Sequence, residues 1–329
     1  MSTEPKTIKW GIIGLGNIAH KFAEDLLTVK DAELYAVASR SQEKADVFAT
    51  KFGAKKAYSS YELLAEDSDL DAVYIATPHV LHKDNTLLCL DHGIAVLCEK
   101  PFAMNAEEVS QMIQKAKDKN VLLMEGLWSY FLPHYQFVLK ELKDKRFGNI
   151  ERLEADFGFY RAFDDSSRLF KKSLGGGSLL DIGIYPIFAA LSTLGMPSKI
   201  SAVSTKFHNG ADSSCDMTFK HLRGGKSYLK STLLEDTPTE AVFYCERGII
   251  KINGQFHAPS SVTLIENSIE KNVAFEYTTH GYNYEIEHFN ALLQQDKNES
   301  DIMSFKFSNM LIGVLDTVRN LIDLEYEVE

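Results

Sequence analysis

The sequence lacks several features that mark secreted, metal-binding and nucleic-acid-binding proteins. It has four cysteines in 329 residues, and none stands in a Cys-x-x-Cys or Cys/His spacing. We therefore expect reduced thiols, no metal and a cytoplasmic location. A formal net charge of −11, with no compensating basic run, argues against a nucleic-acid partner. No signal-peptide core follows Met1 and no apolar stretch has the length of a membrane span, so we expect no membrane partner.

The most informative stretch that is present lies near the start of the chain. An apolar strand-like run, Ile8–Ile13, leads directly into a Gly-x-Gly-x-x-Ala pattern and then into a helical one. Gly14 would form the tight turn, and Gly16 would let a pyrophosphate approach the backbone, where Asn17 and Ile18 offer N–H groups at the helix start. A glycine-rich turn in any α/β protein is the ordinary alternative. The shared register of strand, glycines and helix favours dinucleotide binding.

Strand-like and helix-like segments alternate through the first third of the chain, which predicts βαβ units and a parallel sheet. One of the helices, over residues 106–119, has Asn105 as its N-cap. After about Glu125, strand-like segments alternate with turn signals such as Asn209-Gly210, which predicts hairpins of an antiparallel sheet. Strand candidates there include residues 151–157, 200–207, 227–234, 241–245 and 249–252, and helical patterns cover residues 135–145, 284–295 and 305–324.

These patterns predict an α/β protein of two domains. Residues 1–124 would form a dinucleotide-binding Rossmann domain, a doubly wound parallel sheet. Residues 125–329 would form an α+β domain for substrate binding and oligomerisation, with a large, mostly antiparallel open sheet. We expect the exposed face of that sheet to be apolar, from Val242, Phe243, Ile249, Ile250 and Ile252, and to form the contact of a homo-oligomer.

The end of the second strand indicates which dinucleotide binds. NAD sites place a carboxylate there for the ribose 2′-hydroxyl, whereas this chain has Ser39 and Arg40. A guanidinium can pair with a 2′-phosphate, so we predict NADP, with NAD less favoured. An ordinary solvated arginine at a helix start is the alternative.

Two clusters follow the fourth and fifth strands. Thr77-Pro78-His79 and Glu99-Lys100-Pro101 stand where ligands of open parallel sheets bind. Lys100 could stabilise a developing alkoxide, although an ion pair with Glu99 is the commoner role of such a lysine. His79 and His82, by themselves, are more typical of hydrogen-bonded residues at a helix start than of ligands.

A glycine run, Gly175-Gly176-Gly177, precedes Asp181 and Tyr185, which are four residues apart and so share a helix face. The glycines would let the backbone come close to another group. A tyrosine near a lysine is a plausible proton-transfer pair, because a cation favours the phenolate. The alternative is a half-buried core tyrosine with a capping aspartate.

In order and spacing, these three motifs resemble the glucose–fructose oxidoreductase/inositol dehydrogenase (Gfo/Idh/MocA) family. Within it the similarity is greatest to dimeric dihydrodiol dehydrogenases and NADP-dependent D-xylose 1-dehydrogenases. It covers nearly the whole chain and thins after about residue 210. The resemblance implies a Rossmann domain followed by an open sheet that often forms the oligomer interface, hence a dimer or a dimer of dimers.

The resemblance also implies roles for single residues. Lys100, Tyr185 and Asp181 would be catalytic, with Tyr185 standing where many members have histidine. Trp128 would border the substrate together with Asp181 and Tyr185. Tyr130 replaces an arginine of several relatives, so the contact made by that arginine is not expected here. The predicted cofactor contacts are Gly14, Gly16, Asn17, Ile18, Ser39, Arg40, Thr77, Pro78, His82, Glu99, Lys100 and Arg168.

The resulting hypothesis is an NADP-dependent oxidoreductase that moves a hydride between the nicotinamide and a secondary alcohol or hemiacetal carbon. The substrate would be a sugar, a cyclic polyol or a vicinal diol. Tyr185 would act as general base while Lys100 stabilises the alkoxide and Asp181 orients the substrate. An idle NADP-binding sensor or regulatory subunit on the same fold is the alternative, against which the retained Lys100 and Tyr185 argue.

The first prediction concerns cofactor choice. Arg40→Ala should weaken NADP binding by on the order of 1–3 kcal/mol, because a charge-assisted contact with the 2′-phosphate is lost. NAD binding should stay almost unchanged. Titration calorimetry with both dinucleotides checks this, and equal losses for the two would contradict the 2′-phosphate assignment.

Overall fold

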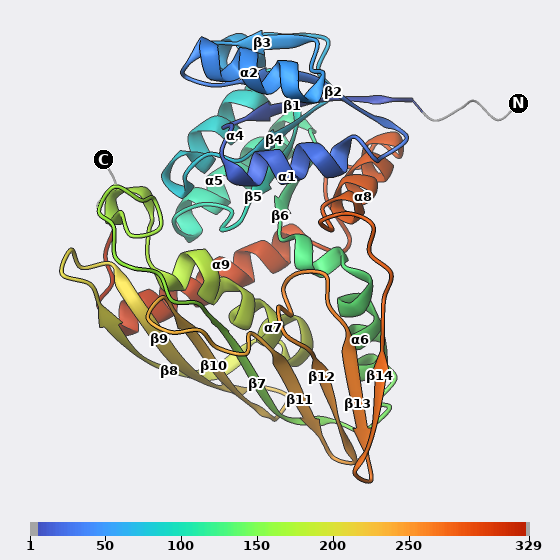
Figure 1. The fold of residues 1–329 in the computed structure, drawn as a ribbon, viewed down its shortest axis with the longest axis vertical. Coiled ribbons are helices and arrows are strands. Elements are labelled where there is room, and N and C mark those ends of the chain that lie inside the picture. Colours follow the sequence, from blue (N-terminus) through green and yellow to red (C-terminus); the bar gives the residue numbers. More distant parts are fainter. Residues whose placement is uncertain (1–5, 327–329) are drawn as a thin grey trace, which may run out of the picture. The chain divides into compact units, whose positions relative to one another are not determined.

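The computed structural model describes residues 6–326, which fall into two compact units (Figure 1). Unit 1 comprises Met1–Trp128 and Thr278–Asn309, and unit 2 comprises Ser129–Tyr277 and Met310–Glu329. The chain passes from the first to the second at the short helix η2 (Trp128–Phe131) and again within helix α9 (Phe305–Leu321).

Unit 1 is built on a parallel sheet, six-stranded over the described residues, in the order β3-β2-β1-β4-β5-β6. Its strands are β1 (Ile8–Ile13), β2 (Ala32–Ala38), β3 (Lys56–Tyr58), β4 (Ala72–Ile75), β5 (Ala95–Glu99) and β6 (Leu123–Gly126). Its helices are α1 (Asn17–Leu26), α2 (Gln42–Phe52), α3 (Tyr61–Ala65), η1 (His79–Leu81), α4 (His82–Asp91), α5 (Ala106–Lys119) and α8 (Asn283–Gln294). The predicted doubly wound parallel sheet is confirmed. Strand order reverses between β1 and β4, the point at which such sheets bind ligands.

The last helix of unit 1 comes from the far end of the sequence. Asp25 of α1 accepts the backbone N–H groups of His280 (3.0 Å) and Tyr282 (2.7 Å), which lead into α8. On α8, Asn290 accepts the indole N–H of Trp10 at 3.0 Å. These buried polar bonds attach residues 278–309 to unit 1. The compact units therefore differ from the predicted division at residues 124 and 125, because the partners of α8 lie more than 250 residues away in sequence.

Unit 2 is built on a sheet that is eight-stranded over the described residues, in the order β14-β13-β12-β11-β7-β10-β9-β8. Its strands are β7 (Ile150–Gly158), β8 (Pro197–Lys206), β9 (Asp212–His221), β10 (Lys226–Thr232), β11 (Ala241–Cys245), β12 (Gly248–Ile252), β13 (Val262–Glu266) and β14 (Ile269–Val273). The other elements that lie wholly in this unit are α6 (Pro133–Lys143), η3 (Lys172–Leu174), η4 (Leu179–Gly183) and α7 (Ile184–Leu194). Among the described strands β7 and β10 pair in parallel and the other neighbours pair antiparallel, as predicted.

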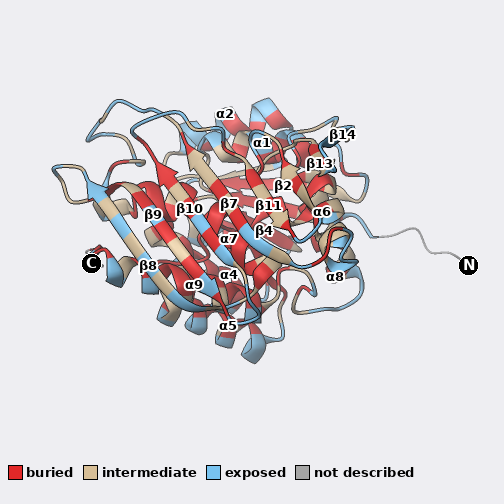
Figure 2. Ribbon diagram, turned by 90° about the horizontal axis from the view of Figure 1, so that it is seen from below, coloured by how far each residue is buried: buried red, intermediate tan, exposed pale blue. Residues whose placement is uncertain are grey.

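Burial alternates along the strands of this sheet, so that one face is covered and the other is open (Figure 2). Phe243, Ile250 and Ile252 are fully buried on the covered face. Val242 and Ile249 are half-buried on the opposite face. The prediction that all five residues line the exposed face is therefore wrong for three of them, because side chains in a strand alternate between its faces.

One helical stretch, Lys172–Leu194, is long and apolar enough to cross a membrane by length and composition. The expectation that no apolar stretch has the length of a membrane span is therefore wrong for this segment. Its most apolar window is 89% buried inside the fold. Within unit 2 its helix α7 packs against β7 and β10, and nine of the 11 residues of α7 are buried. A helix that is apolar on all sides is typical of a protein core as well as of a membrane.

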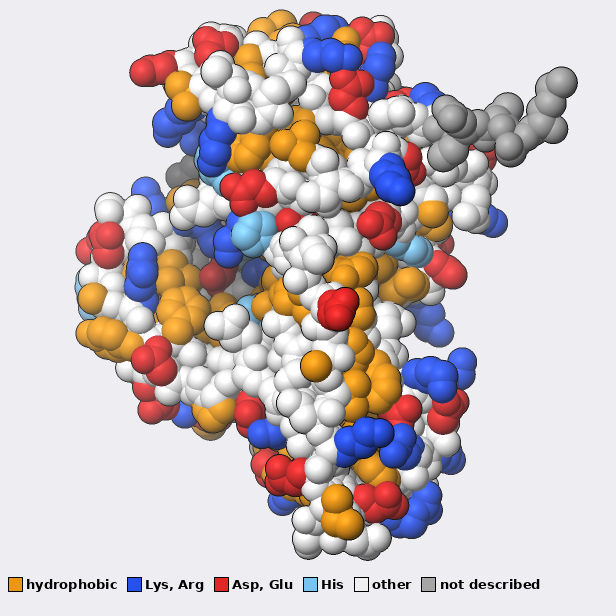
Figure 3. Space-filling view, turned by 45° about the vertical axis from the view of Figure 1, so that its right-hand side comes forward, with side chains coloured by type: hydrophobic (Ala, Val, Ile, Leu, Met, Phe, Trp, Pro, Cys, Tyr) orange, Lys and Arg blue, Asp and Glu red, His pale blue; other side chains and the backbone are white. Residues whose placement is uncertain are grey.

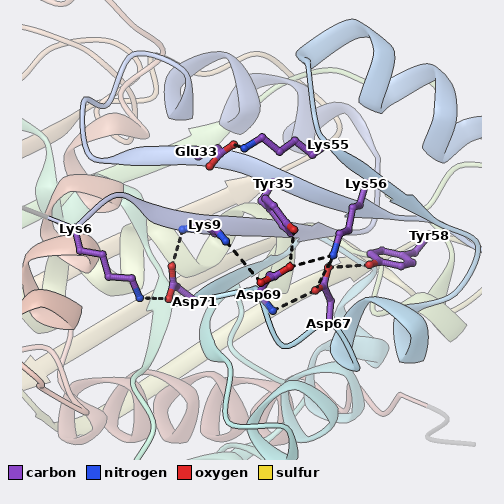
Figure 4. A network of polar contacts seen from close by, with 10 residues as sticks. All are labelled: Lys6, Lys9, Glu33, Tyr35, Lys55, Lys56, Tyr58, Asp67, Asp69 and Asp71. Carbon is purple, nitrogen blue, oxygen red and sulfur yellow. Dashed lines mark hydrogen bonds and ion pairs between the residues drawn. The ribbon is translucent and has the colours of Figure 1, made fainter.

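Charged side chains of both signs are interspersed on the face of the molecule seen in Figure 3. A denser network lies in unit 1, beside the starts of β1, β3 and β4 (Figure 4). There Lys56 Nζ donates to both carboxylate oxygens of Asp67 at 3.0 Å and to Asp69 at 3.3 Å. The Tyr58 hydroxyl donates to Asp67 at 2.7 Å, and that of Tyr35 donates to Asp69 at 2.8 Å.

These bonds lower the pKa of both aspartates. Burial alone would raise the pKa of Asp67, but hydrogen bonds from Tyr58 and Lys56 outweigh it. For Asp69 the hydrogen bond from Tyr35 lowers the pKa most. A lowered folded-state pKa means that the carboxylates stabilise the fold above their unfolded pKa near ~4, and that this contribution is lost as the pH falls through the folded values.

Asp67→Asn should therefore lower the free energy of unfolding at neutral pH by about 1–3 kcal/mol, the value of hydrogen bonds to a charged group. It should also flatten the loss of stability between about pH 5 and about pH 3. Urea denaturation at several pH values measures both effects. Glu66→Gln, at an exposed neighbour, is the control. An unchanged acid profile in Asp67→Asn would contradict the assignment.

Candidate functional site

The two glycines after β1 have different surroundings. Gly14 has φ +89°, and a Cβ there would lie 2.8 Å from the backbone of Ala76, so the fold itself requires glycine. At Gly16, by contrast, a Cβ would meet none of the described atoms within 4 Å. Gly16 is the N-cap of α1, and no side chain in the described chain caps the helix start at Asn17 and Ile18. Open space beside free N–H groups at a helix start fits a pyrophosphate.

The end of β2 has a polar but not an acidic environment. Ser39 is half-buried, and its hydroxyl oxygen accepts the N–H of Ser41 at 3.3 Å. Arg40 follows it and is exposed. Tyr61 of α3 lies beside the guanidinium: burial raises the pKa of this phenol, and the charge of Arg40 opposes the rise. The guanidinium of Arg40 thus follows the end of β2, at the carboxyl edge of the parallel sheet, and Gly16 lies at the same edge.

The loops after β4 and β5 are joined by one histidine. His82 is fully buried, with Nε2 2.9 Å from the Thr77 carbonyl oxygen and Nδ1 2.8 Å from that of Pro101. Asn85 also donates to the Thr77 hydroxyl at 3.2 Å. Both ring nitrogens face the backbone, so His82 supports the two loops, and its predicted cofactor contact stays a prediction. Pro78 is half-buried on the first of these loops.

The end of β5 carries two charged residues, Glu99 and Lys100, with different environments within unit 1. Lys100 is half-buried, whereas Glu99 is buried and points inward. The carboxylate of Glu99 accepts a short hydrogen bond from the Tyr74 hydroxyl and a 3.2 Å bond from the Lys100 N–H. Burial, followed by the charge of Glu99, raises the pKa of Tyr74 well above its usual value. Glu99 thus supports the strand end from inside the unit.

Trp128 stacks on Tyr282 with ring centroids 4.5 Å apart and planes at 4°. Both rings belong to unit 1, and both are buried. Tyr282 is a residue that the sequence analysis missed, because it follows no motif and lies far from Trp128 along the chain. The pair is a face-to-face contact of two buried rings within unit 1, and the substrate contact of Trp128 stays a prediction.

In unit 2 other parts of the same unit pack closely against the glycine run. Gly177 has φ +130°, and a Cβ there would lie 2.1 Å from Oδ1 of Asp212. At Gly176 a Cβ would lie 2.6 Å from the carbonyl oxygen of Arg168. The expected close approach is therefore real, and its partners are Asp212 and the loop before the run. Asp212 was not identified from the sequence, since nothing in β9 marks it.

Asp212 fixes the start of the helix that carries the predicted catalytic residues. Its Oδ2 accepts the Ser178 hydroxyl at 2.8 Å and the Leu179 N–H at 2.7 Å. Burial raises the pKa of Asp212 to about 6, and the bonds from Ser178 and Leu179 oppose this rise. A carboxylate bonded to the first N–H groups of a helix acts as its N-terminal cap.

Asp181 lies in the π-helical turn η4, and Tyr185 lies in the first turn of α7 directly after it. Arg168 donates to Asp181 at 3.0 Å. The sequence predicted Arg168 as a cofactor contact, and the structure shows it bound to Asp181. Single π-turns inside helices are frequent at functional sites.

Tyr185 has aromatic neighbours within unit 2. Its ring centroid lies 5.0 Å from that of His257 and 5.7 Å from that of Phe157. His257 in turn stacks on Phe157 at 4.1 Å. His257 is a second group able to move a proton beside Tyr185, and no spacing in the sequence pointed to it. Tyr130 packs edge-on against Phe188 at 5.0 Å, which accounts for an aromatic ring at this position.

Within the described residues, no group of three or more His, Cys, Asp or Glu side chains could hold a metal ion.

Two family models match the chain. One, described as an oxidoreductase family with an NAD-binding Rossmann fold, matches residues 8–127, and the GFO/IDH/MocA C-terminal domain matches residues 135–251. The chain is 35% identical to trans-1,2-dihydrobenzene-1,2-diol dehydrogenase of Xenopus tropicalis, over 97% of this chain and 99% of that protein. It is 32% identical to scyllo-inositol 2-dehydrogenase (NADP(+)) of Bacillus subtilis (strain 168), over 98% and 99%.

Solved structures share the fold across nearly the whole chain. An aldose-aldose oxidoreductase from Caulobacter crescentus, complexed with glycerol, matches with a TM-score of 0.89 and 20% identity. A 3-ketoreductase from Actinomadura kijaniata, in complex with NADP, matches with a TM-score of 0.85 and 24% identity. Each match covers 97% of this chain and 98% of the other.

The glycine run generates a stability prediction. Gly177→Ala should destabilise unit 2 by roughly 2–5 kcal/mol, because the new Cβ overlaps Asp212 and the backbone angle disfavours an L side chain. Gly195→Ala is the matched control at the other end of α7. It also has a positive φ, but its Cβ would meet none of the described atoms within 4 Å, so only about 1–2 kcal/mol should be lost. Urea denaturation compares the two, and equal losses would contradict the role of Asp212.

Proposed function

This chain belongs to the Gfo/Idh/MocA oxidoreductase family, and we propose that it is an NADP-dependent dehydrogenase or reductase acting on a CH–OH group. The observation that carries the proposal is the open, uncapped start of α1 at Gly16, on the sheet edge where Lys100 also follows its strand. The curated relatives act on diols and inositols by name, which supports a sugar, cyclic polyol or vicinal diol as the substrate class.

NADP is the cofactor that the relatives and the residues support. The inositol dehydrogenase is named for NADP(+), and the 3-ketoreductase was solved with NADP. On this chain the N–H groups of Asn17 and Ile18 would bind the pyrophosphate and Arg40 would bind the 2′-phosphate. The loop of Thr77 and Pro78 would line the same edge. When bound, the nicotinamide accepts or donates the hydride.

The residues of the chain would then handle the proton and the charge. During oxidation Tyr185 takes the hydroxyl proton of the substrate as the C–H bond gives up its hydride. Lys100 stabilises the negative charge that develops on the substrate oxygen. Asp181, held by Arg168, accepts a hydrogen bond from a neighbouring substrate hydroxyl and orients the ring. In the reverse direction Tyr185 returns the proton to the carbonyl oxygen.

The alternative of an idle NADP-binding sensor has no support. The relatives reported above are named as dehydrogenases, reductases or oxidoreductases. Lys100 and Tyr185, which a sensor would not need, are both retained.

We also propose a cytoplasmic homo-oligomer, a dimer or a dimer of dimers, formed through the open face of the unit 2 sheet. The four cysteines, all in the described chain, are free and buried, which agrees with a reducing compartment. On the open face, Val203 of β8 is 68% exposed and Tyr228 of β10 is 43% exposed, while Glu154 and Lys230 lie beside them. A broad sheet face with exposed apolar groups is typical of an association surface.

Introducing a charged side chain on this face tests the proposed oligomer. Light scattering at micromolar concentration should show more than a monomer for the wild-type protein. Val203→Lys should shift the population toward monomer, because an ammonium would lose its water in the contact. Val47→Lys, at an exposed valine of α2 in unit 1, is the control. A monomeric wild-type protein would contradict the proposal.

The catalytic assignment predicts that Tyr185→Phe lowers turnover by ~10²–10⁴-fold, since the proton acceptor is lost while the ring remains. Lys100→Met should lose a comparable factor and shift the basic limb of the pH–rate profile. The double variant should be little worse than either single one, because the groups act as a unit. Steady-state kinetics with a panel of aldoses, inositols and diols measures these effects.

NADP affinity should survive in Tyr185→Phe, since the phenol contacts the substrate and not the phosphates. Near wild-type turnover in that variant would move the general-base role elsewhere. His257 would then be the next candidate, since both ring nitrogens of His82 face backbone carbonyls.

A further inference from the structure

Lys100 is followed by a short segment whose backbone is bound by side chains of unit 1. The carbonyl oxygen of Pro101 lies 2.8 Å from Nδ1 of His82. The N–H of Phe102 donates to Oε1 of Glu125 at 3.0 Å. His82 begins α4 and Glu125 stands near the end of β6, so two elements hold this segment from opposite sides.

The two bonds belong to a single peptide group. The oxygen of Pro101 and the N–H of Phe102 are the two ends of the same amide, with His82 at the oxygen and Glu125 at the N–H. Amide resonance moves electron density from nitrogen to oxygen, so a donor at the oxygen and an acceptor at the N–H strengthen each other. The effect is largest when the donor is a cation and the acceptor an anion.

The hydrogen-bond geometry of His82 favours that cation. Its second nitrogen, Nε2, lies 2.9 Å from the carbonyl oxygen of Thr77. Neither carbonyl oxygen can donate a proton, and a neutral imidazole has one N–H and one lone pair. The neutral ring would therefore point a lone pair at a carbonyl oxygen, whereas the imidazolium donates to both. A cation in a fully buried ring needs a compensating anion.

Glu125 supplies an anion at the other side of the peptide. It is 2% exposed, and burial raises its pKa to about 7. Ser308 and the Phe102 N–H oppose this rise; among charged neighbours, Glu99 adds to it and Lys100 opposes it. The ring of His79 lies 5.7 Å from that of His82. When the carboxylate is ionised, it and the imidazolium can stabilise each other across the amide.

We propose that His82 and Glu125 form a buried ion pair, bridged by the Pro101–Phe102 peptide, that acts as a positioning device for Lys100. The pair joins the loop after β4 to the loop after β5. It thereby fixes the backbone position of Lys100, from which the ammonium group extends. Neither residue touches the reacting atoms. The inference rests on the proposed catalytic role of Lys100 and adds the residues that hold it.

The charge state of His82 is tested directly by ¹⁵N NMR of protein labelled at histidine. At pH 8 the wild-type spectrum should contain one buried histidine with protons on both ring nitrogens, and the signal should vanish in His82→Gln. In Glu125→Gln the same ring should revert to a neutral tautomer, because its counter-charge is gone. His92→Gln, at an exposed histidine that ends α4, should leave the signal in place. A neutral His82 in the wild-type protein would overturn the proposal.

Kinetics then test the positioning role. His82→Gln and Glu125→Gln should each lower kcat by ~10- to 100-fold, the cost of a misplaced catalytic group, with a smaller change in KM. The double variant should be no worse than the more damaged single variant, whereas independent structural effects would multiply. His92→Gln should keep wild-type turnover. Wild-type kcat in both single variants would overturn the positioning role.

The ion pair and the catalytic role of Lys100 can fail separately. Normal turnover in Lys100→Met would contradict the proposed catalytic role of Lys100. The NMR experiment would still show whether the His82–Glu125 ion pair exists. If His82 were neutral at pH 8, the ion pair would fall and the role of Lys100 would stand. Should either glutamine variant fold poorly, the wild-type spectrum alone decides the charge state.

Discussion

The parallel pairing of β1 with both β2 and β4 is the constraint on which the rest of unit 1 depends. Parallel strands end at one edge of the sheet, so every loop that leaves this edge is brought to the same place. The start of α1, the side chain of Arg40 and the segment of Lys100 are separated by many residues in sequence. They share this edge because their strands point the same way.

In both units, buried carboxylates bind the backbone where particular segments begin. Asp25 accepts two backbone N–H groups at the entry to α8, and Asp212 accepts one at the entry to η4. Glu125 accepts the N–H that follows Pro101. In each case a buried carboxylate is tolerated because it binds backbone donors, and the bond fixes where a functional segment begins. These carboxylates bind the backbone of the chain itself.

Glycine serves two different purposes in the same chain. At Gly16 the missing Cβ leaves open space beside a helix start, which suits a ligand. At Gly14 and Gly177 the space is already filled, by Ala76 and Asp212 respectively. A glycine-rich motif in a sequence therefore does not by itself say whether a ligand or the protein occupies the room. That distinction is made by the neighbours that folding supplies.

The local pattern of the sequence was enough for much of the architecture. The helix predicted over residues 106–119 is α5, with Asn105 accepting the N–H of Glu108 as its cap. The strand predicted over residues 241–245 is β11, and Asn209-Gly210 lies in the turn between β8 and β9. Strands β9, β13 and β14 were not among the predicted ones, although Cys215, Met217 and Phe219 of β9 alternate with polar residues.

The sequence by itself determined the parallel first sheet and predicted the dinucleotide loop, because periodicity and turn chemistry act over a few residues. Lys100, Asp181 and Tyr185 were predicted as the chemical candidates from their spacing together with the family resemblance. The tertiary structure alone decided that α8 completes unit 1, that Asp212 holds the glycine run, that His257 lies beside Tyr185 and that His82 faces two carbonyls. Each of these contacts joins segments distant in sequence or depends on where a buried ring points, and only the packed chain brings such groups within hydrogen-bonding or van der Waals distance.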